Sequence, residues 1–473
     1  MMHERKFTLE DQNIFARLSG DYNKLHVDKI AARRYLFGGQ VVHGIHIVLW
    51  ALDQWLETSP NPVELVSLRV DFDKNLSVGE KVNCRVVSEG NNRIELKIYE
   101  EGQICLSISV GWKLPSAQAA DNLNTGFPAE RNCKVLSSEE VKKASGELAL
   151  YIDKHTAGEL FPQVAKKLPF MQMAQILAST RLVGMECPGF HSIFFALDVK
   201  FEGVKGSAPV LKYRVVNFDN RFSLSSIEVQ GPSMKGTLKA FLRPPPTQQA
   251  GFSDLCKIVT ADEFNGQRAL IIGGSRGLGE LVSKLLAAGG ARIILTYVEG
   301  KEDAQRVMEE IVSKGGTQAD IMYFNVLAPG ESQTDHLVNF SPTHLYYFAT
   351  PPIAANKEGF SVKLFRKFCD YYVGGFSDTL EFILEHAPGL RKIFYPSSVF
   401  VEELPVSLGE YACAKAAGEA LCLFIGKRKK NILINAPRLP KMATDQTASL
   451  MLDDRSDPVE TMLKQLRDFK NRS

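Results

Sequence analysis

The C-terminal part of the chain alternates short apolar runs with helical segments, and this pattern restricts its fold more than any other feature of the sequence. Helical segments such as 279–290, 302–316 and 411–428 lie between several of the apolar runs. Strands that are apolar on both faces and separated by helices are typical of a parallel sheet covered on both sides. The sequence therefore predicts a doubly wound α/β domain over residues 265–473. Its expected strands are RALIIGG, ARIILTY, IMYFNV, HLYYFAT, RKIFYPSS and NILINAP.

Two blocks precede this domain, and each shows the same order of predicted elements. Residues 1–115 contain an apolar helix at about 41–57 and then four stretches with strand periodicity: LVSLRVDF, KVNCRVVSE, RIELKIYE and ICLSISVGW. Residues 133–242 contain PFMQMAQILASTRLVGM and then HSIFFALDVKF, PVLKYRVVNF, FSLSSIEVQ and GTLKAFLR. One long helix followed by antiparallel strands indicates a helix wrapped by a curled sheet. The second block has no catalytic residues that match the first, so we interpret it as a tandem duplication in element order only.

Turn-rich stretches at 114–132 and 243–256 separate the three blocks. Three consecutive prolines in the second stretch exclude a helix or a central strand there. A chain of 473 residues is also expected to form two or three domains.

Charge and cysteine content narrow the class of protein. Lys and Arg total 56 and Asp and Glu total 54, so there is no electrostatic reason to expect nucleic acid or an anionic membrane as a partner. The eight cysteines include no CxxC pair, which indicates reduced thiols, without a metal site or a disulfide framework. The N-terminus has no apolar signal segment, and VVHGIHIVLWAL is too short to span a bilayer. We therefore expect a cytoplasmic protein.

A glycine-rich turn, ALIIGGSRGLGE, connects the first predicted strand of the α/β domain to a helix. Glycine permits a tight turn and lets the backbone approach a pyrophosphate, which the positive end of the helix then faces. The turn therefore predicts a dinucleotide site made by Gly273, Ser275, Arg276, Gly277, Leu278 and Gly279.

The end of the second strand bears on the choice of nucleotide. A carboxylate there would receive the ribose hydroxyls of NAD(H), but the strand ends at Tyr297. Arg276 could instead meet a 2′-phosphate, so we favour NADP(H) over NAD(H). Glu299 lies close by and could reverse this preference.

Tyr411 and Lys415 lie four residues apart on a predicted helix, so both occupy one face. An ammonium near a phenol favours the phenolate and lowers the pKa of the tyrosine, which would suit acid–base work near neutral pH. Ser398 ends a strand thirteen residues before Tyr411 and could hydrogen-bond the reacting oxygen.

The order GGSRGLG, SSV and YACAK resembles the short-chain dehydrogenase/reductase family, and the resemblance covers residues 265–473. It implies a Rossmann fold in which Tyr411 is the acid/base, Lys415 binds the nicotinamide ribose and Ser398 orients the substrate carbonyl. Asn325 and Val326 would contact adenine. The sequence departs from the family at Phe348–Pro351, near Tyr372 and at Arg438, so a fold without activity is an alternative.

The first block begins with an acidic and histidine-rich segment, SGDYNKLHVDKIAARRYLFGGQVVHGI. Asp21 and His26 would diverge by about 140° on a regular helix, so they can share a water only if the chain turns irregularly, as Gly20 and Asn23 permit. A carboxylate and an imidazole around one water suit reversible hydration of an activated double bond. The amide of Gly44, near a helix start, could polarise a thioester carbonyl.

This segment resembles the MaoC-type, (R)-specific enoyl-CoA hydratase family, which has the hotdog fold. The family's Asp-x-Asn-Pro-x-His matches at Asp21, Asn23 and His26 with Lys24 in place of proline, and its His-Gly matches at His43–Gly44. The resemblance implies that Asp21 and His26 are the catalytic pair and that Asn23, His43 and Gly44 bind substrate. It does not imply which catalytic residue handles the water. With the second block as another hotdog half, the expected N-terminal fold is an α+β double hotdog.

The two chemistries are consecutive, since a reductase makes a 3-hydroxyacyl thioester that a dehydratase converts to the 2-enoyl form. We expect a bifunctional reductase/dehydratase of fatty-acid or polyketide-type metabolism, with acyl-CoA or an acyl carrier protein thioester as substrate. By analogy with both folds we expect a homo-oligomer. The alternatives are a reductase whose hotdog region only binds thioesters, and a non-catalytic assembly protein of a biosynthetic cluster.

Overall fold

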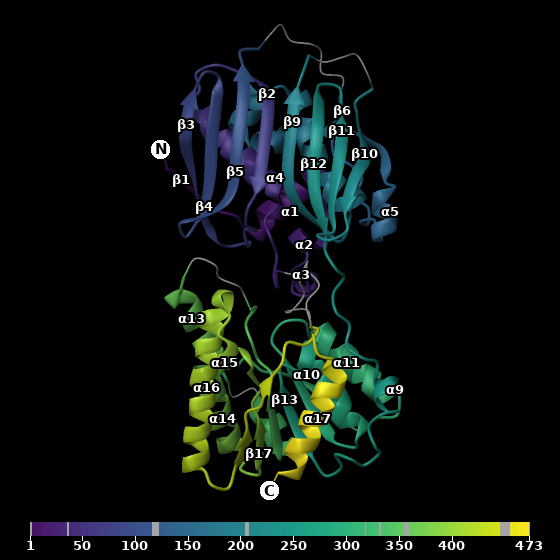
Figure 1. The fold of residues 1–473 in the computed structure, drawn as a ribbon, viewed down its shortest axis with the longest axis vertical. Coiled ribbons are helices and arrows are strands. Elements are labelled where there is room, and N and C mark those ends of the chain that lie inside the picture. Colours follow the sequence, from purple (N-terminus) through teal and green to yellow (C-terminus); the bar gives the residue numbers. More distant parts are fainter. Residues whose placement is uncertain are drawn as a thin grey trace. The chain divides into compact units, whose positions relative to one another are not determined.

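The computed structural model describes residues 2–35, 37–115, 123–203, 208–316, 318–330, 333–353, 359–444 and 455–472. They fall into two compact units that divide near residue 245, each with its own sheet and core (Figure 1). The expected linker at 114–132 includes residues 116–122, which lie outside the described residues.

One antiparallel sheet spans the whole of the first unit, in the order β1-β3-β4-β5-β2-β9-β12-β11-β10-β7. Its two halves join where β2 pairs with β9, with Leu68 opposite Val199. Its strands are β1 (Met2–Lys6), β2 (Glu64–Phe72), β3 (Lys81–Gly90), β4 (Arg93–Glu100), β5 (Gln103–Lys113), β7 (Ser145–Ala149), β9 (Ser192–Phe201), β10 (Val210–Asp219), β11 (Leu224–Gln230) and β12 (Met234–Leu242).

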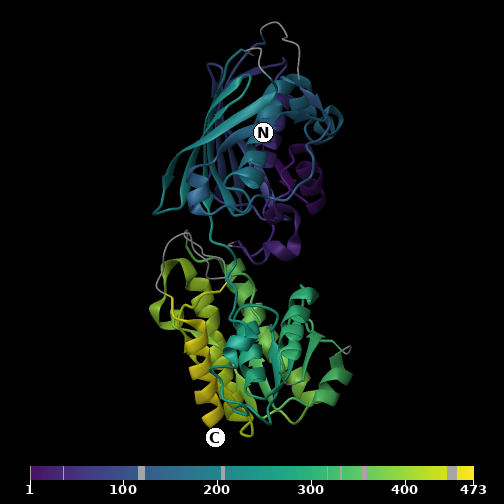
Figure 2. The ribbon, with the colours of Figure 1, turned by 90° about the vertical axis from the view of Figure 1, so that its right-hand side faces the viewer.

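Two buried helices, α4 (Gly44–Thr58) and α8 (Phe170–Arg181), pack against the same side of this sheet, as Figure 2 shows for the helices of the unit as a group. Each helix precedes four strands, so the predicted repetition of element order is confirmed. Polar contacts tie the halves together, because the Gln172 side chain bonds both backbone groups of Leu65 (2.9 Å each). The halves therefore share one core.

Short helices cover the ends of α4 and α8. Those of the first half are α1 (Leu9–Ser19), α2 (Lys24–Val27) and α3 (Lys29–Ala32). Those of the second half are α5 (Ser138–Lys142), α6 (Lys154–Leu160), α7 (Pro162–Lys167) and the π-helical turn η1 (Leu182–Glu186), with the short strands β6 (Asn124–Thr125) and β8 (Tyr151–Ile152) paired beside them. Asp53 of α4 accepts hydrogen bonds from the first amides of α7, at Gln163 and Val164 (2.7 and 2.9 Å).

The second unit has a parallel sheet in the order β15-β14-β13-β16-β17-β19, which confirms the doubly wound prediction. The order of the strands reverses between the parallel neighbours β13 and β16, and folds of this kind bind ligands at the carboxyl ends of the strands at such a point. The strands are β13 (Arg268–Ile272), β14 (Arg292–Tyr297), β15 (Ala319–Tyr323), β16 (His344–Tyr347), β17 (Lys392–Phe394) and β19 (Leu433–Asn435).

Helices cover both faces of this sheet, because its strands alternate apolar side chains between two core clusters. One face packs against α10 (Gly277–Ala288), α11 (Lys301–Ser313) and α17 (Pro458–Asn471), and the other against α12 (Thr334–Phe340), α14 (Gly375–His386) and α16 (Gly409–Arg428). Helix α13 (Val362–Cys369) runs through a π-helical turn, η3 (Asp370–Gly374), into α14. Shorter elements are α9 (Phe252–Leu255), β18 (Ser397–Ser398), α15 (Phe400–Glu403), η4 (Val406–Leu408) and β20 (Arg438–Leu439).

No helix among the described residues is both long enough and apolar enough to cross a bilayer.

Candidate functional sites

Asp21 and Asn23 lie on the irregular turn between α1 and α2, and His26 lies in α2 itself. Helix α1 ends at Gly20 in the left-handed conformation (φ 77°), and Asn23 caps α2 by accepting from the Leu25 amide. This break brings Asp21 and His26 together despite their unfavourable helical spacing. One carboxylate oxygen of Asp21 and one ring nitrogen each of His26 and His43 all lie within 4.8 Å of one another.

The two histidine rings are stacked, with centroids 3.9 Å apart. Nδ1 of His26 donates to the Val41 carbonyl (2.7 Å), which leaves its Nε2 as the nitrogen with a free lone pair. His43 donates from Nε2 to the Asp21 carbonyl (3.0 Å), and its Nδ1 lies 3.0 Å from the Gln12 side-chain oxygen. Both ring nitrogens of His43 thus face oxygen atoms of the protein. The Asp21 carboxyl and Nε2 of His26 are therefore the groups that can exchange protons with a substrate.

The second half of the unit forms the wall behind Asp21. The Thr180 hydroxyl donates to Oδ2 of Asp21 (2.7 Å), and a Cβ at Gly184 would lie 2.2 Å from Oδ1. The Asn23 amide group donates to carbonyls of the same half, including that of Gly184 (3.1 Å). Sequence reasoning missed Thr180 and Gly184, and nothing in a single sequence distinguishes them from other helix residues.

Burial dominates the electrostatics of this cluster. It raises the pKa of Asp21 and lowers the pKa of His26, while their mutual attraction opposes both shifts. Burial, followed by the charge of His26, lowers the pKa of His43 well below its usual value. The buried state therefore favours neutral imidazoles beside a carboxyl that holds its proton more tightly than usual.

Gly44 is the first residue of α4, where the helix N-terminus presents unpaired amides. A Cβ there would lie 2.4 Å from the Phe72 ring, so only glycine fits without movement of that ring. The structure thus places Gly44 directly after His43, at the end of the helix where a carbonyl oxygen would be stabilised.

The glycine-rich turn of the second unit runs from β13 into α10. Gly273 has φ 79° and Gly277 has φ 59°, and a Cβ at Gly279 would lie 2.1 Å from the Gly273 carbonyl oxygen. The Gly273 amide is held by the Thr296 hydroxyl (3.0 Å). The turn therefore keeps space for a pyrophosphate at the N-terminus of a 12-residue helix.

The other predicted nucleotide contacts surround this turn. Arg276 is the N-cap residue of α10, Ser275 precedes it, and Leu278 is the second residue of the helix. Half-buried Tyr297 ends β14 and packs edge-on against Tyr323. Asn325 and Val326 follow β15, as expected for residues at the carboxyl edge of the sheet.

Ser398, Tyr411 and Lys415 come together at the same edge of the sheet. Tyr411 and Lys415 lie on α16, and Ser398 in β18 hydrogen-bonds the Tyr411 phenol. Nζ of Lys415 donates to the Pro396 carbonyl (2.7 Å). Each of these three residues is at most 9% exposed.

The expectation that Lys415 lowers the pKa of Tyr411 is wrong, because in this structure the pKa of Tyr411 is raised. Burial raises the pKa of Tyr411 to about 12, although the Ser398 hydrogen bond opposes the shift. Burial lowers the pKa of Lys415 to about 7. Because Nζ is 6.0 Å from the Tyr411 ring centroid, its attraction does not offset the loss of solvent around the phenol.

The departures from the family pattern have structural partners. Tyr372 in η3 places its ring 4.0 Å from Nζ of Lys415, and its hydroxyl lies 2.5 Å from that of Thr350. Arg438 pairs with Glu419 through two hydrogen bonds (2.9 and 2.7 Å) and also contacts Glu402. Tyr372 thus contacts Lys415 and Thr350, and Arg438 contacts Glu419.

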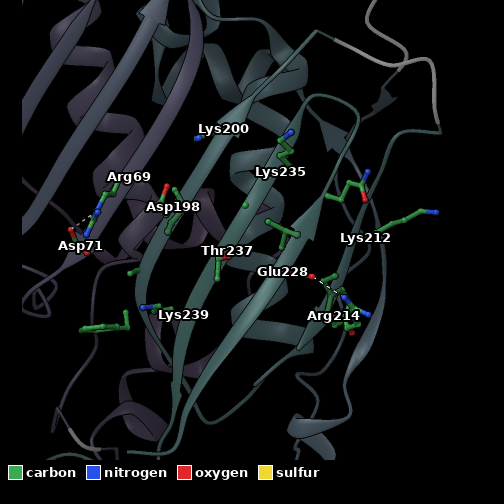
Figure 3. A pocket seen from close by; sticks show the side chains of 17 residues that line it. Arg69, Asp71, Asp198, Lys200, Lys212, Arg214, Glu228, Lys235, Thr237 and Lys239 are labelled. Atoms are coloured by element: carbon green, nitrogen blue, oxygen red, sulfur yellow. Dashed lines mark hydrogen bonds and ion pairs between the residues drawn. The ribbon is translucent and has the colours of Figure 1, made fainter. Parts of the chain in front are cut away.

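A shallow hollow of about 1000 Å³ lies on the outer face of the first sheet (Figure 3). Among its charged side chains, Arg69 pairs with Asp71 (3.3 Å) and Arg214 pairs with Glu228 (3.1 Å). It contains none of the predicted site residues, and we assign no reaction to it.

Sequence models of two families match the chain. The MaoC-like domain matches residues 2–105, and the short-chain dehydrogenase matches residues 267–346. The first match contains Asp21, His26 and Gly44, and the second contains the glycine-rich turn but ends before Ser398, Tyr411 and Lys415.

Among characterised relatives, an Arabidopsis thaliana protein named NADPH-dependent aldehyde reductase-like is 28% identical, over 36% of this chain and 70% of that protein. A probable tetrahydroxynaphthalene reductase of Zymoseptoria tritici is 34% identical, over 18% of this chain and 31% of that protein. The second relative is therefore matched over less than a third of its length.

Solved structures resemble the second unit. A Burkholderia cenocepacia short-chain dehydrogenase in complex with NADP is 20% identical and covers 43% of this chain and 89% of its own, with a TM-score of 0.38. An Agrobacterium tumefaciens 3-oxoacyl (acyl-carrier-protein) reductase with NADP bound is 21% identical and covers 44% and 88%, also with a TM-score of 0.38. From the two family matches, the chain joins a MaoC-like domain at its N-terminus to a short-chain dehydrogenase domain at its C-terminus.

Proposed function

We propose that the chain is a bifunctional enzyme that reduces a 3-oxoacyl thioester and dehydrates the resulting (R)-3-hydroxyacyl thioester. One observation carries the proposal: two separate acid–base clusters, Asp21–His26 and Ser398–Tyr411–Lys415, are each assembled and buried within one chain. Acyl-CoA or an acyl carrier protein would bring the substrate, in fatty-acid or polyketide-type metabolism.

A nicotinamide dinucleotide fits the second unit, because Cβ atoms at Gly273 and Gly279 would lie 3.0 and 2.1 Å from neighbouring backbone atoms, so the tight turn at the start of α10 needs glycine at both positions. We favour NADP(H), since Arg276 stands at the helix start and Tyr297 takes the place of an acidic residue. Two similar proteins of known structure contain NADP, and the Arabidopsis relative is named as NADPH-dependent. When bound, this cofactor supplies the hydride.

In the reduction, the Ser398 hydroxyl orients the substrate carbonyl, and Tyr411 protonates its oxygen as the carbonyl carbon is reduced. A pKa of about 12 keeps the proton on Tyr411 until that oxygen becomes basic. Lys415, held by the Pro396 carbonyl, lies where it can bind the ribose hydroxyls of the cofactor.

In the dehydration, Nε2 of His26 removes the proton from C2 and the Asp21 carboxyl protonates the departing 3-hydroxyl, which leaves as water. The hydrogen bond from Nδ1 of His26 to Val41 supports this choice, because it leaves Nε2 as the base. The raised pKa of Asp21 supports its role as the acid. The Gly44 amide would stabilise negative charge on the thioester oxygen.

We further propose that the first unit is a double hotdog, with halves near 1–115 and 133–242 joined to a Rossmann domain at 265–473. The α4-plus-four-strand and α8-plus-four-strand order supports this description. In this view the second half widens the thioester site without its own acid–base pair.

A product assay on the purified full chain tests the proposal. With NADPH and a 3-oxoacyl thioester, we expect NADPH oxidation followed by both the 3-hydroxyacyl and the 2-enoyl product. The 3-hydroxyacyl product alone would show a reductase with a hotdog scaffold, and no turnover would indicate an assembly protein. Equal or faster turnover with NADH would contradict the choice of NADP(H).

A further inference from the structure

The hydroxyl of Thr180 reaches the candidate catalytic carboxyl from the other half of the unit. Thr180 lies on α8 and Asp21 precedes α2, 159 residues earlier in the chain, yet Oγ1 is 2.7 Å from Oδ2. Thr180 is 3% exposed and Asp21 is 1% exposed, so water does not compete for this bond. A charge-assisted hydrogen bond in such a place has a large effect on the carboxyl.

Each oxygen of the Asp21 carboxyl has a defined partner. Oδ1 accepts a hydrogen bond from the backbone N–H of Asn23 (3.2 Å), and Oδ2 accepts one from the hydroxyl of Thr180. Gly184, one turn after Thr180, lies so close that a Cβ would be 2.2 Å from Oδ1. The carboxyl therefore cannot rotate freely, and the α8–η1 segment fixes one side of it.

The charged and titratable groups around Asp21 come from four segments, one of which carries His43 before α4, with a ring nitrogen within 4.8 Å of the Asp21 carboxyl. His26 on α2 and Arg181 on α8 each favour the ionised carboxyl, as do the hydrogen bonds from Thr180 and Asn23. Cys133 is also near enough to feel the Asp21 charge. Burial is the largest influence and acts in the opposite direction, so each hydrogen-bond donor matters.

We propose that Thr180 is a positioning residue of the dehydratase site, which holds the Asp21 carboxyl toward His26. This inference rests on the proposed dehydratase function. It gives the second half a part in the chemistry, through a side chain that never touches the substrate.

The assignment leaves the reaction balance unchanged. One C2–H bond and one C3–O bond break, and a C2=C3 double bond forms. His26 takes the C2 proton and Asp21 gives its proton to the departing hydroxyl, which leaves as water. Transfer of the proton from His26 to Asp21 then restores the pair. The pair carries one proton in its active state, whichever residue holds it, and titrates as a unit. Thr180 acts by setting the pH range in which that state is populated.

The test compares three variants of the full chain in the hydration and dehydration of a 2-enoyl-CoA/3-hydroxyacyl-CoA couple. Thr180→Val removes the hydroxyl and keeps the shape, while Thr180→Ser keeps a hydroxyl. Ser179→Ala is the matched control, because Ser179 is buried on the same helix and its hydroxyl bonds only the Ile176 carbonyl (2.6 Å).

We expect Thr180→Val to move the acid limb of the kcat/KM profile upward by about one pH unit and to lower kcat about 10-fold, with KM nearly unchanged. Thr180→Ser should restore the profile, and Ser179→Ala should not shift it. An unshifted Thr180→Val, or a Thr180→Ser as impaired as Thr180→Val, would overturn the proposal.

A spectroscopic titration separates this inference from the proposed function. The infrared carboxyl band that disappears in Asp21→Asn reports the protonation of Asp21 without any turnover. If the wild-type chain showed no hydration, the proposed function would fail, but this band would still decide the role of Thr180. An upward shift of its midpoint in Thr180→Val supports the role, and an unchanged midpoint refutes it.

Discussion

Nζ of Lys415 lies 4.0 Å from the ring centroid of Tyr372, closer than the 6.0 Å that separates it from the ring centroid of Tyr411. The ammonium is thus held over the face of an aromatic ring, in the region near Tyr372 where the sequence departs from the family pattern. A cation over such a ring is stabilised by about 0.5–2 kcal/mol. Tyr372 therefore contributes to the placement of the lysine that we assign to the ribose.

This contact predicts different results for two substitutions at the same position. Tyr372→Leu should raise the KM for NADPH by about 2- to 30-fold, because Lys415 loses the ring beneath it. Tyr372→Phe keeps the ring and should stay near the wild-type KM, which can be measured by steady-state kinetics at saturating acyl thioester. Similar losses in both variants would show that the phenol hydroxyl, bonded to Thr350, is the important group.

Tyr411→Phe should lower the reductase kcat by about 100-fold or more, because the proton donor to the substrate oxygen is removed. NADPH binding, followed by fluorescence titration, should change little. Tyr346→Phe is the control, since Tyr346 in β16 is also buried and its hydroxyl donates to the side chain of Gln267 (2.9 Å), which belongs to neither candidate site. A Tyr411→Phe enzyme with wild-type turnover would refute the assignment.

Asp21→Asn and His26→Gln should each lower hydration of a 2-enoyl thioester by at least about 100-fold, because each removes one member of the acid–base pair. NADPH oxidation with a 3-oxoacyl thioester should continue in both variants, and the product should then stop at the 3-hydroxyacyl thioester. This retained reduction is an internal control for folding. Normal formation of the enoyl product would exclude the pair.

Gly279→Ala should abolish NADPH binding, because its Cβ would lie 2.1 Å from the Gly273 carbonyl oxygen and force the turn to shift. Gly426→Ala, on the exposed part of α16 with open space around it, is the matched control. That substitution should leave binding intact and stabilise the helix by up to about 1 kcal/mol. Isothermal titration with NADPH compares the two, and tight binding by Gly279→Ala would contradict the proposed cradle.

Lys415 should make the stability of the chain depend on pH. Its folded pKa of about 7 lies below the value near 10.4 that is typical of an unfolded chain. Between these values the unfolded state binds a proton that the folded state does not, so the free energy of unfolding should rise with pH. Lys415→Met should flatten the rise between about pH 7 and 10 in denaturant titrations, and equal slopes would show that burial does not deprotonate Lys415.

The sequence by itself determined the elements and the two motifs. The apolar runs of residues 265–473 predicted the parallel strands, since a strand covered on both faces must be apolar throughout. The periodic stretches around α4 and α8 likewise predicted the antiparallel strands of the first unit. Local spacing also placed Tyr411 with Lys415, and the break at Gly20 placed Asp21 near His26.

Only the tertiary structure decided how these groups are surrounded. Thr180 meets Asp21 because two helices far apart in the sequence pack under one sheet, and no local pattern records that approach. The pKa of Tyr411 rises instead of falling because the phenol and Lys415 are buried together. Desolvation depends on every atom that surrounds a group, so it follows from packing and cannot be predicted from the spacing of two residues.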